Sequence, residues 1–217
     1  MIKPGTEGRT HCIRCGTCCL KGGPVLHQED KKTLLSGYAG HKDLVTIRTG
    51  EMAYNPLKDC LEPVPMELIK VAGRGDGWSC VFYNEQESCC SLYEHRFLEC
   101  RLLRCWDPSD LISVIYQDTI RRADIINAGD PIMEVIALHE KECPHNKINA
   151  LVSALSDGKK RKEIFAELSG FVHADSSLRI HAFSELGLEK EFELFIFGRP
   201  LYRILADRGI SVHELQP

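Results

Sequence analysis

The segment Cys12-Ile13-Arg14-Cys15-Gly16-Thr17-Cys18-Cys19 places four thiols close together near the amino terminus. Two-residue spacers allow a turn to point successive sulfurs at one centre, and Gly16 permits the backbone conformation that a tight chelating loop often needs. Thiolates are soft donors that suit zinc, copper(I) and iron–sulfur clusters. The run C-x2-C-x2-C matches the spacing in bacterial ferredoxins, whose remaining ligand is distant in sequence. The segment therefore predicts a metal site rather than a set of buried apolar thiols.

The other cysteines support this interpretation. The chain has 217 residues and 11 cysteines, and 10 of these cysteines lie in residues 1–106. The total is odd, and adjacent pairs such as Cys18-Cys19 and Cys89-Cys90 fit disulfide geometry poorly. The amino-terminal sequence MIKPGTEGRTHC is polar and lacks the apolar stretch of a secretory signal. We therefore expect a cytoplasmic protein whose reduced thiols bind metal instead of forming disulfides.

A second cysteine motif lies further along the chain. It reads Cys80-x8-Cys89-Cys90-Ser-Leu-Tyr-Glu-His-Arg-Phe-Leu-Glu-Cys100-Arg-Leu-Leu-Arg-Cys105. If the segment after Leu92 is helical, arginines lie one turn before Cys100 and Cys105. Cationic side chains in that position stabilise thiolates. The alternative is a solvated helix face on which the arginines pair with Glu94 and Glu99.

These two motifs resemble those of the YkgJ-type cysteine-cluster family, described as a zinc- or iron-chelating domain of the CxxCxxCC type. The likeness covers about residues 10–106, and the two motifs agree in order and spacing. The resemblance implies as metal ligands Cys12, Cys15, Cys18, Cys19, Cys80, Cys90 and Cys100. We add Cys105 as the best candidate for an eighth ligand, because it lies one helical turn from Cys100. The pattern leaves open which of Cys60, Cys89, Cys90 and Cys105 complete the set, and Cys143 lies outside it.

The number of thiols bears on the kind of metal centre. Seven or eight thiolates exceed the four that one zinc ion or one cubane cluster needs, so there are either two centres or spare cysteines. We favour an iron–sulfur cluster, [4Fe–4S], used for electron transfer or redox sensing, because the first motif is ferredoxin-like. The alternative is zinc in a structural or scaffold module without redox activity.

Other classes of function receive little support from the sequence. Phosphate-binding glycine loops, nucleophile elbows and HExxH motifs are absent, so we predict no catalytic residues and no organic cofactor. Larger proteins with a similar cysteine cluster include flagellin lysine N-methylase, but this chain has no methyl-donor motif, and we expect no enzymatic activity. The net charge of −4 predicts neither nucleic-acid nor membrane binding. We expect a protein partner that the sequence does not identify. Weaker ligand candidates are His11, His27, His95 and His145.

The overall pattern predicts a mainly α protein with two domains. Residues 1–106 are expected to form an irregular, loop-rich, metal-bound domain, because they lack the periodicity to bury a core alone. This domain is expected to contain short helices at 28–35 and 66–72 and short strands within 43–54 and 78–83. Residues 107–217 are expected to be helical, because proline and glycine punctuate amphipathic segments. The expected helices span 107–127, a segment from 130, 146–156, 159–185, 188–197 and 200–208.

Overall fold

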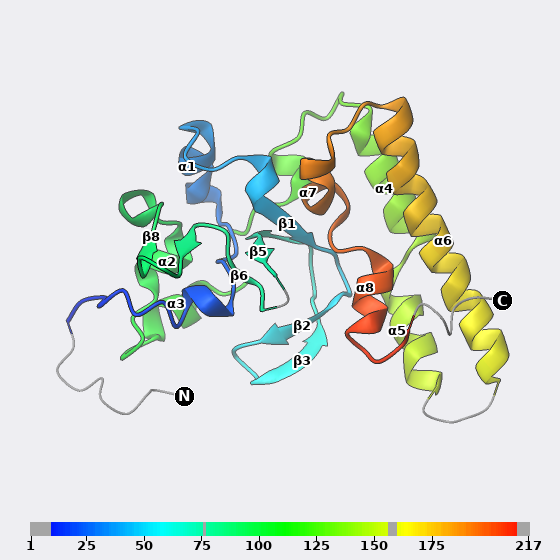
Figure 1. Ribbon diagram of the computed structural model, residues 1–217, viewed down its shortest axis with the longest axis horizontal. Helices are drawn as coiled ribbons and strands as arrows, with labels where there is room; N and C mark the ends of the chain where they lie inside the picture. Colours follow the sequence, from blue (N-terminus) through cyan, green and yellow to red (C-terminus); the bar gives the residue numbers. More distant parts are fainter. Residues whose placement is uncertain (1–9, 76, 156–159, 212–217) are drawn as a thin grey trace. The chain divides into compact units, whose positions relative to one another are not determined.

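Two compact units make up the protein (Figure 1). The computed structural model describes residues 10–75, 77–155 and 160–211. Unit 1 comprises Met1–Val45 and Leu68–Arg121, and unit 2 comprises Thr46–Glu67 and Arg122–Pro217. Each unit is thus assembled from two separate stretches of chain. The predicted domain boundary after residue 106 stays a prediction, because these units are defined by their internal contacts and not by independent folding.

The balance of secondary structure corrects the predicted fold class. Helices account for 47% and strands for 15% of the described residues. The fold is therefore mixed, and the prediction of a mainly α protein is wrong. Helices are concentrated in the C-terminal half, while the N-terminal half contains short pairs of strands. Within the described ranges, no helix combines the length and apolar character needed to cross a bilayer.

Unit 1 consists of short elements joined by tight turns. Its helices are α1 (Lys31–Leu35), α2 (Leu98–Leu102) and α3 (Ser109–Val114), and its strands are β4 (Leu68–Val71), β5 (Gly73–Arg74), β6 (Ser79–Cys80), β7 (Tyr83–Asn84) and β8 (Cys89–Cys90). β5 pairs antiparallel with β6, and β7 pairs antiparallel with β8. β4 pairs with β1 (Leu44–Ile47), the strand in which the chain passes from unit 1 to unit 2. The two small hairpins place three cysteines of the second motif on strands.

The helix predicted at 66–72 is wrong, because this segment contains β4. Leu68, Ile69 and Val71 are all buried, as is typical of a strand covered on both faces. The N–H of Leu26 donates to the carbonyl of Ile69 over 2.8 Å, and the N–H of Val71 donates to the carbonyl of Pro24 over 2.9 Å. The pairing partners are distant in sequence, so local signals from proline and glycine do not reveal them.

The helix predicted at 107–127 is confirmed only in its first part. α3 begins at Ser109 and ends at Val114. Tyr116 and Asp118 then have φ angles of 63° and 44°, which a right-handed helix does not accommodate. The N–H of Ile120 then donates to the carbonyl of Leu26 over 3.0 Å. Within the rest of the predicted range, a 3₁₀ turn spans Arg122–Asp124.

Several short elements of the first half are confirmed. The helix predicted at 28–35 is present as a 3₁₀ turn, Gln28–Asp30, followed by α1. Asp30 accepts a hydrogen bond from the N–H of His27 over 2.9 Å and so caps this turn. The strands expected within 43–54 are β1 and β2 (Met52–Asn55). The region 78–83 contains β6 and the start of β7, two short strands instead of one.

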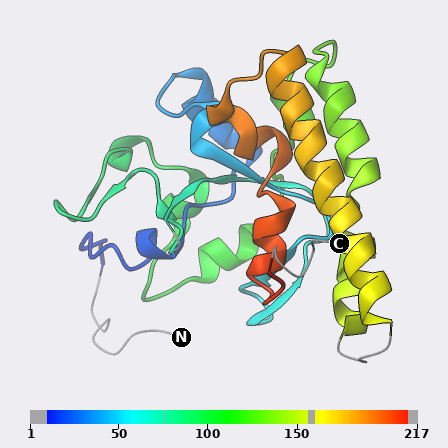
Figure 2. The ribbon, with the colours of Figure 1, turned by 45° about the vertical axis from the view of Figure 1, so that its right-hand side comes forward.

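Unit 2 is a group of helices with one hairpin. β2 pairs antiparallel with β3 (Cys60–Pro63), and the helices are α4 (Ile132–Glu142), α5 (His145–Ala154), α6 (Arg161–Glu185), α7 (Glu193–Phe197) and α8 (Leu201–Ala206). The long helix α6 packs against α4, α5 and α8 (Figure 2). A core cluster comprises Ile148, Ile164, Leu168, Leu201, Ile204, Leu205 and Ile210. The helices predicted in this region are confirmed within a few residues, although residues 156–159 lie outside the described residues.

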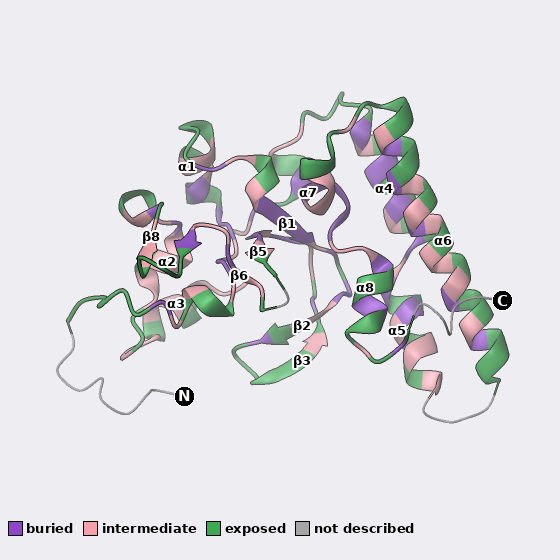
Figure 3. Cartoon of the chain, in the orientation of Figure 1, coloured by how far each residue is buried: buried purple, intermediate pink, exposed green. Residues whose placement is uncertain are grey.

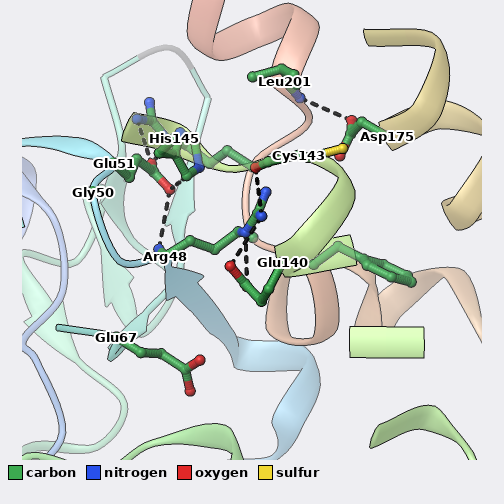
Figure 4. Close-up of polar contacts among 12 residues, drawn as sticks. Arg48, Gly50, Glu51, Glu67, Glu140, Cys143, His145, Asp175 and Leu201 are labelled. Atoms are coloured by element: carbon green, nitrogen blue, oxygen red, sulfur yellow. Dashed lines mark hydrogen bonds and ion pairs between the residues drawn. The ribbon is translucent and has the colours of Figure 1, made fainter. Parts of the chain in front are cut away.

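Several buried residues of unit 2 are charged, and they lie alongside the apolar ones. Figure 3 colours the chain by burial. Arg122 donates to Glu67 over 2.6 Å and to Glu140 over 2.6 Å. Arg48 donates to Glu140 over 2.9 Å and to the carbonyl of Cys143 over 2.8 Å (Figure 4). Burial alone would raise the pKa of Glu140, but hydrogen bonds and charge from the two arginines lower it to about 2. This buried network makes the arginines structural and not solvent-facing.

Candidate metal centre

A cavity of unit 1 collects the cysteines of both motifs. Its volume is about 210 Å³, and the cysteines in its lining are Cys12, Cys15, Cys18, Cys19, Cys80, Cys90, Cys100 and Cys105. These are the eight residues predicted as metal ligands. Cys60, Cys89 and Cys143 do not line the cavity, and Cys60 and Cys143 belong to unit 2. The structure therefore gathers the predicted set in one place, while ligation itself stays a prediction.

The two motifs contribute to the cavity in different ways. In the first motif, Cys12, Cys15 and Cys18 are exposed, and Cys19 is half-buried at the start of a 3₁₀ turn. In the second motif, Cys80 is buried on β6, while the cysteines on β8 and α2 are half-buried. Cys105, which follows α2, is exposed. The first motif is thus an exposed loop, and the second is anchored in secondary structure.

A close contact between Gly16 and Tyr83 joins the two motifs. Gly16 is buried and has a φ angle of 72°, in the left-handed region that glycine adopts readily. A Cβ atom at this position would overlap the hydroxyl and ring of Tyr83. Tyr83 lies on β7, directly opposite Cys90 on β8. The tyrosine therefore fixes the loop of the first motif against a strand of the second.

Tyr93 provides another link between the motifs. The guanidinium carbons of Arg14 and Arg96 lie 4.0 Å and 3.9 Å from the centre of its ring. Cation–π contacts of this kind contribute about 0.5–1 kcal/mol each at exposed sites. The Nε–H of Arg96 also donates to the carbonyl of Tyr93 over 2.8 Å. All three side chains line the cavity, so positive charge lies beside the thiols.

The helix expected after Leu92 is interrupted, and this corrects the expected placement of the arginines. Residues Tyr93–His95 form a 3₁₀ turn, and α2 spans only Leu98–Leu102. Cys105 therefore does not share a helix with Cys100. Arg101 forms an ion pair with Glu29, and Arg104 forms one with Asp110, instead of pairing with the expected glutamates.

The thiols of the cavity differ in how readily they ionise. The sulfurs of Cys18 and Cys19 lie 3.9 Å apart. Hydrogen bonding from Cys19 lowers the pKa of Cys18 to about 6, and the same bond raises the pKa of Cys19. Burial raises the pKa of Cys80 and of Cys100. A metal that binds here must therefore displace protons, because thiolates and not thiols are the ligands.

The arrangement of donors fits a soft metal but is not a finished coordination sphere. The potential donors in the lining are thiols apart from the carboxylate of Glu99 and the hydroxyls of Tyr83, Ser88 and Tyr93. Over the described ranges, no three His, Cys, Asp or Glu side chains are grouped closely enough to hold one ion. Binding through both motifs would therefore require thiols of the lining to come closer together than they lie in this structure.

The histidines considered as ligands have other contacts. The lining contains none of His11, His27, His95 and His145. The Nδ1 of His27 hydrogen bonds with the carbonyl of Gln117 over 2.8 Å, and His95 stacks on Tyr38 at 3.5 Å between ring centres. His145 belongs to unit 2. The site is therefore defined by sulfur and not by imidazole.

Tyr83 and Glu99 are among the lining residues that were not predicted from the sequence. Tyr83 packs on Gly16, and Glu99 accepts a hydrogen bond from the N–H of Val25 over 2.7 Å. Glu99 directly precedes Cys100 and Tyr83 follows Cys80 by three positions. Proximity to predicted ligands was therefore the available signal, but it does not reveal which segments these side chains contact.

Comparison with known proteins agrees with this cavity. The CxxCxxCC family model, described as "Putative zinc- or iron-chelating domain", matches residues 11–124, which is more than half of the chain and includes all eight cavity cysteines. The chain therefore belongs to the CxxCxxCC family, and the resemblance found in its two motifs is confirmed. Neither a curated protein nor a solved structure matches the chain. Chelation of zinc or iron is thus the function that the family supports.

Proposed function

We propose that the cysteine cavity of unit 1 binds an iron–sulfur cluster, [4Fe–4S], with which the protein transfers electrons or senses redox state in the cytoplasm. The observation that carries this proposal is the gathering of eight cysteines around one cavity. Four thiolates suffice for one cubane cluster. The set therefore supplies one cluster with thiols to spare, or two centres.

The surroundings of the thiols support a redox cluster. Leu103, Trp106 and Leu111 contribute apolar side chains to the lining. Apolar shielding and nearby charge are the means by which proteins adjust the reduction potential of a cluster. When bound, the cluster would supply one-electron chemistry. The chain would bind it through thiolates, limit its contact with water and place the guanidinium groups of Arg14 and Arg96 nearby.

Metal and sulfide analysis tests this proposal directly. Full-length protein purified without oxygen should be brown and contain iron and acid-labile sulfide in near-equal amounts. A colourless protein without iron or sulfide would refute the iron–sulfur assignment. Cys60→Ser is a matched control, because Cys60 is also exposed but lies in unit 2. It should retain iron, whereas Cys15→Ser should lose it.

Zinc in a structural role is the second candidate, and the exposed first motif favours it. Residues 12–16 form no helix or strand, so a metal crosslink would add to the contacts of Arg14 and Gly16 that already hold this segment. In this case the protein contains zinc, is unaffected by air and loses structure with a chelator. Circular dichroism before and after chelation measures this loss of structure. Exposure to air separates the two candidates, since a redox cluster would bleach in air and zinc would not.

Electron transfer requires a partner, and we propose that this partner is a protein. We propose binding to neither nucleic acid nor membranes and no catalytic activity. Turnover assays with methyl donors test the last point, since activity would refute it.

A further inference from the structure

Lys70 lies behind a loop that lines the cysteine cavity. It is a half-buried residue of β4, between Ile69 and Val71, which are fully buried. Its ammonium donates a hydrogen bond to the carbonyl of Gly23. Gly22 and Gly23 both line the cavity, and a Cβ atom at Gly22 would lie 3.7 Å from the Nζ of Lys70. The ammonium therefore contacts the backbone of a loop that lines the cavity.

The position of Lys70 relative to the loop is fixed by backbone pairing. Gly23 lies so close to Val71 that a Cβ atom would overlap its side chain. The carbonyl of Pro24 accepts a hydrogen bond from the N–H of Val71 over 2.9 Å, and Val25 forms an antiparallel bridge with Lys70 itself. Backbone pairing thus fixes β4 against the loop, and the hydrogen bond to Gly23 holds the ammonium at the loop.

Two thiols of the cavity are among the groups that favour the charged form of Lys70. Burial lowers the pKa of Lys70, while Glu99, Cys100 and Cys80, in that order, favour its charged form. Glu99 already accepts a hydrogen bond from Val25 and lies 3.5 Å from the Nε2 of His27. In the part of the chain that the structure describes, Lys70 has no carboxylate within ion-pair distance. By contrast, Arg101 and Arg104 are each neutralised by a carboxylate.

We propose that Lys70 is a positioning residue of the metal centre, whose ammonium supports the Gly22–Gly23 loop and compensates the negative charge of metal-bound thiolates. This inference rests on the proposed function, but it applies to either metal, because zinc or a cubane cluster with four thiolates carries net negative charge. Coulomb interactions are strengthened where protein replaces water. A nearby cation stabilises the reduced, more negative cluster, and it also opposes loss of metal.

Substitutions of one lysine in the full-length protein test this role. Lys70→Met keeps the apolar stem and removes the charge, while Lys70→Arg keeps the charge. The matched control is Lys42→Met, because Lys42 is an exposed lysine of the same unit. Each protein is purified without oxygen, its iron and sulfide are measured, and its midpoint potential is determined by redox titration.

We expect Lys70→Met to retain iron and to have a lower midpoint potential than the wild type. Lys70→Arg should remain close to the wild-type potential, and Lys42→Met should not differ from it. An unchanged potential in Lys70→Met with full iron content would overturn the proposal. So would an equal shift in Lys70→Met and Lys70→Arg, because the effect would then not follow the charge.

If Lys70→Met retains only part of its iron, competition with a chelator answers the question, because the rate at which the remaining metal leaves can still be measured. The charge role expects metal to leave Lys70→Met several-fold faster than the wild type and Lys70→Arg at the wild-type rate. Rapid loss from both variants would show a purely steric role and overturn the proposal. A wild-type protein that contains zinc and no iron refutes the iron–sulfur function alone, and the same competition with zinc then tests Lys70.

Discussion

The ring of Tyr83 occupies the space that a side chain at residue 16 would need. Gly16 belongs to the exposed loop of the first cysteine motif, whereas Tyr83 stands on a strand paired with the second. Convergence of the two motifs thus depends on the absence of one methyl group. The family is named for its cysteines, but Gly16, which lies between them, is also restricted by its contact with Tyr83.

Gly16→Ala should destabilise unit 1 and reduce its metal content. A left-handed backbone costs alanine about 1–2 kcal/mol, and overlap with Tyr83 adds about 1–3 kcal/mol. Gly37→Ala is a matched control, because Gly37 has a φ angle of 75° but no atom within 4 Å of the added Cβ. Denaturant unfolding and metal analysis compare the two variants. Equal losses of stability would show that contact with Tyr83 does not matter.

Single replacements of cysteine should separate cavity residues from the others. Cys18→Ser should release metal, because Cys18 lines the cavity and has a pKa lowered to about 6 by its bond with Cys19. Cys143→Ala should retain the metal, since Cys143 is fully buried in unit 2, where its sulfur donates to the carbonyl of Phe171 over 3.7 Å. The measurement is bound metal per chain. Loss of metal from Cys143→Ala would contradict the assignment of the cavity as the site.

Removal of the buried Arg122 should destabilise unit 2 severely. Arg122→Met leaves Glu67 without this guanidinium and leaves Glu140 with Arg48 alone. Breaking a buried ion pair from one side costs about 3–5 kcal/mol. Arg203→Met is the control at an exposed arginine and should change the free energy of unfolding by at most about 0.5 kcal/mol. A similar small effect at Arg122 would mean that its carboxylate partners are solvated.

Acid should lower the free energy of unfolding because of the buried residue His145. The Nε2 of this buried residue has no hydrogen-bond partner and lies 3.8 Å from Glu51, which is already paired with Arg199. Burial, followed by the charge of Arg48, lowers the pKa of His145 to about 3, so the folded state does not take up the proton that the unfolded chain binds below pH 6.5. The stability that this neutral histidine preserves is complete above pH 6.5 and is lost as the pH falls towards 3.

The corresponding measurement compares free energies of unfolding at pH 7 and pH 5. The wild type should lose about 2 kcal/mol more over this interval than His145→Gln, whose side chain does not titrate. His181→Gln, at an exposed histidine of α6, should keep the wild-type dependence. If His145→Gln retained the full dependence on pH, protonation of this residue would not be its cause.

Local patterns predicted which cysteines gather at one cavity better than they predicted the fold around it, while ligation by these cysteines stays a prediction. The spacing of cysteines reports directly on ligand chemistry, and all eight predicted residues line one cavity. The strand at Leu68–Val71 was mistaken for a helix, because its partner segments are distant in sequence. The left-handed residues Tyr116 and Asp118 end α3 without a glycine to mark the turn. The sequence did not single out Arg48 or Arg122, since their buried partners follow only from tertiary packing.

Each unit is built from two separate stretches of chain, so the order of synthesis determines when each unit is complete. Residues 46–67 are synthesised well before residues 122–217, with which they belong in unit 2. Their hairpin, β2–β3, carries the exposed side chains of Tyr54, Leu57 and Leu61, and an isolated two-stranded hairpin is marginal in water. During translation, residues 46–67 are therefore complete before the part of unit 2 that follows Arg121 has been synthesised. A chain truncated after Arg121 would contain all of unit 1 and the β2–β3 hairpin, but it would lack the helices of unit 2 with which the hairpin belongs.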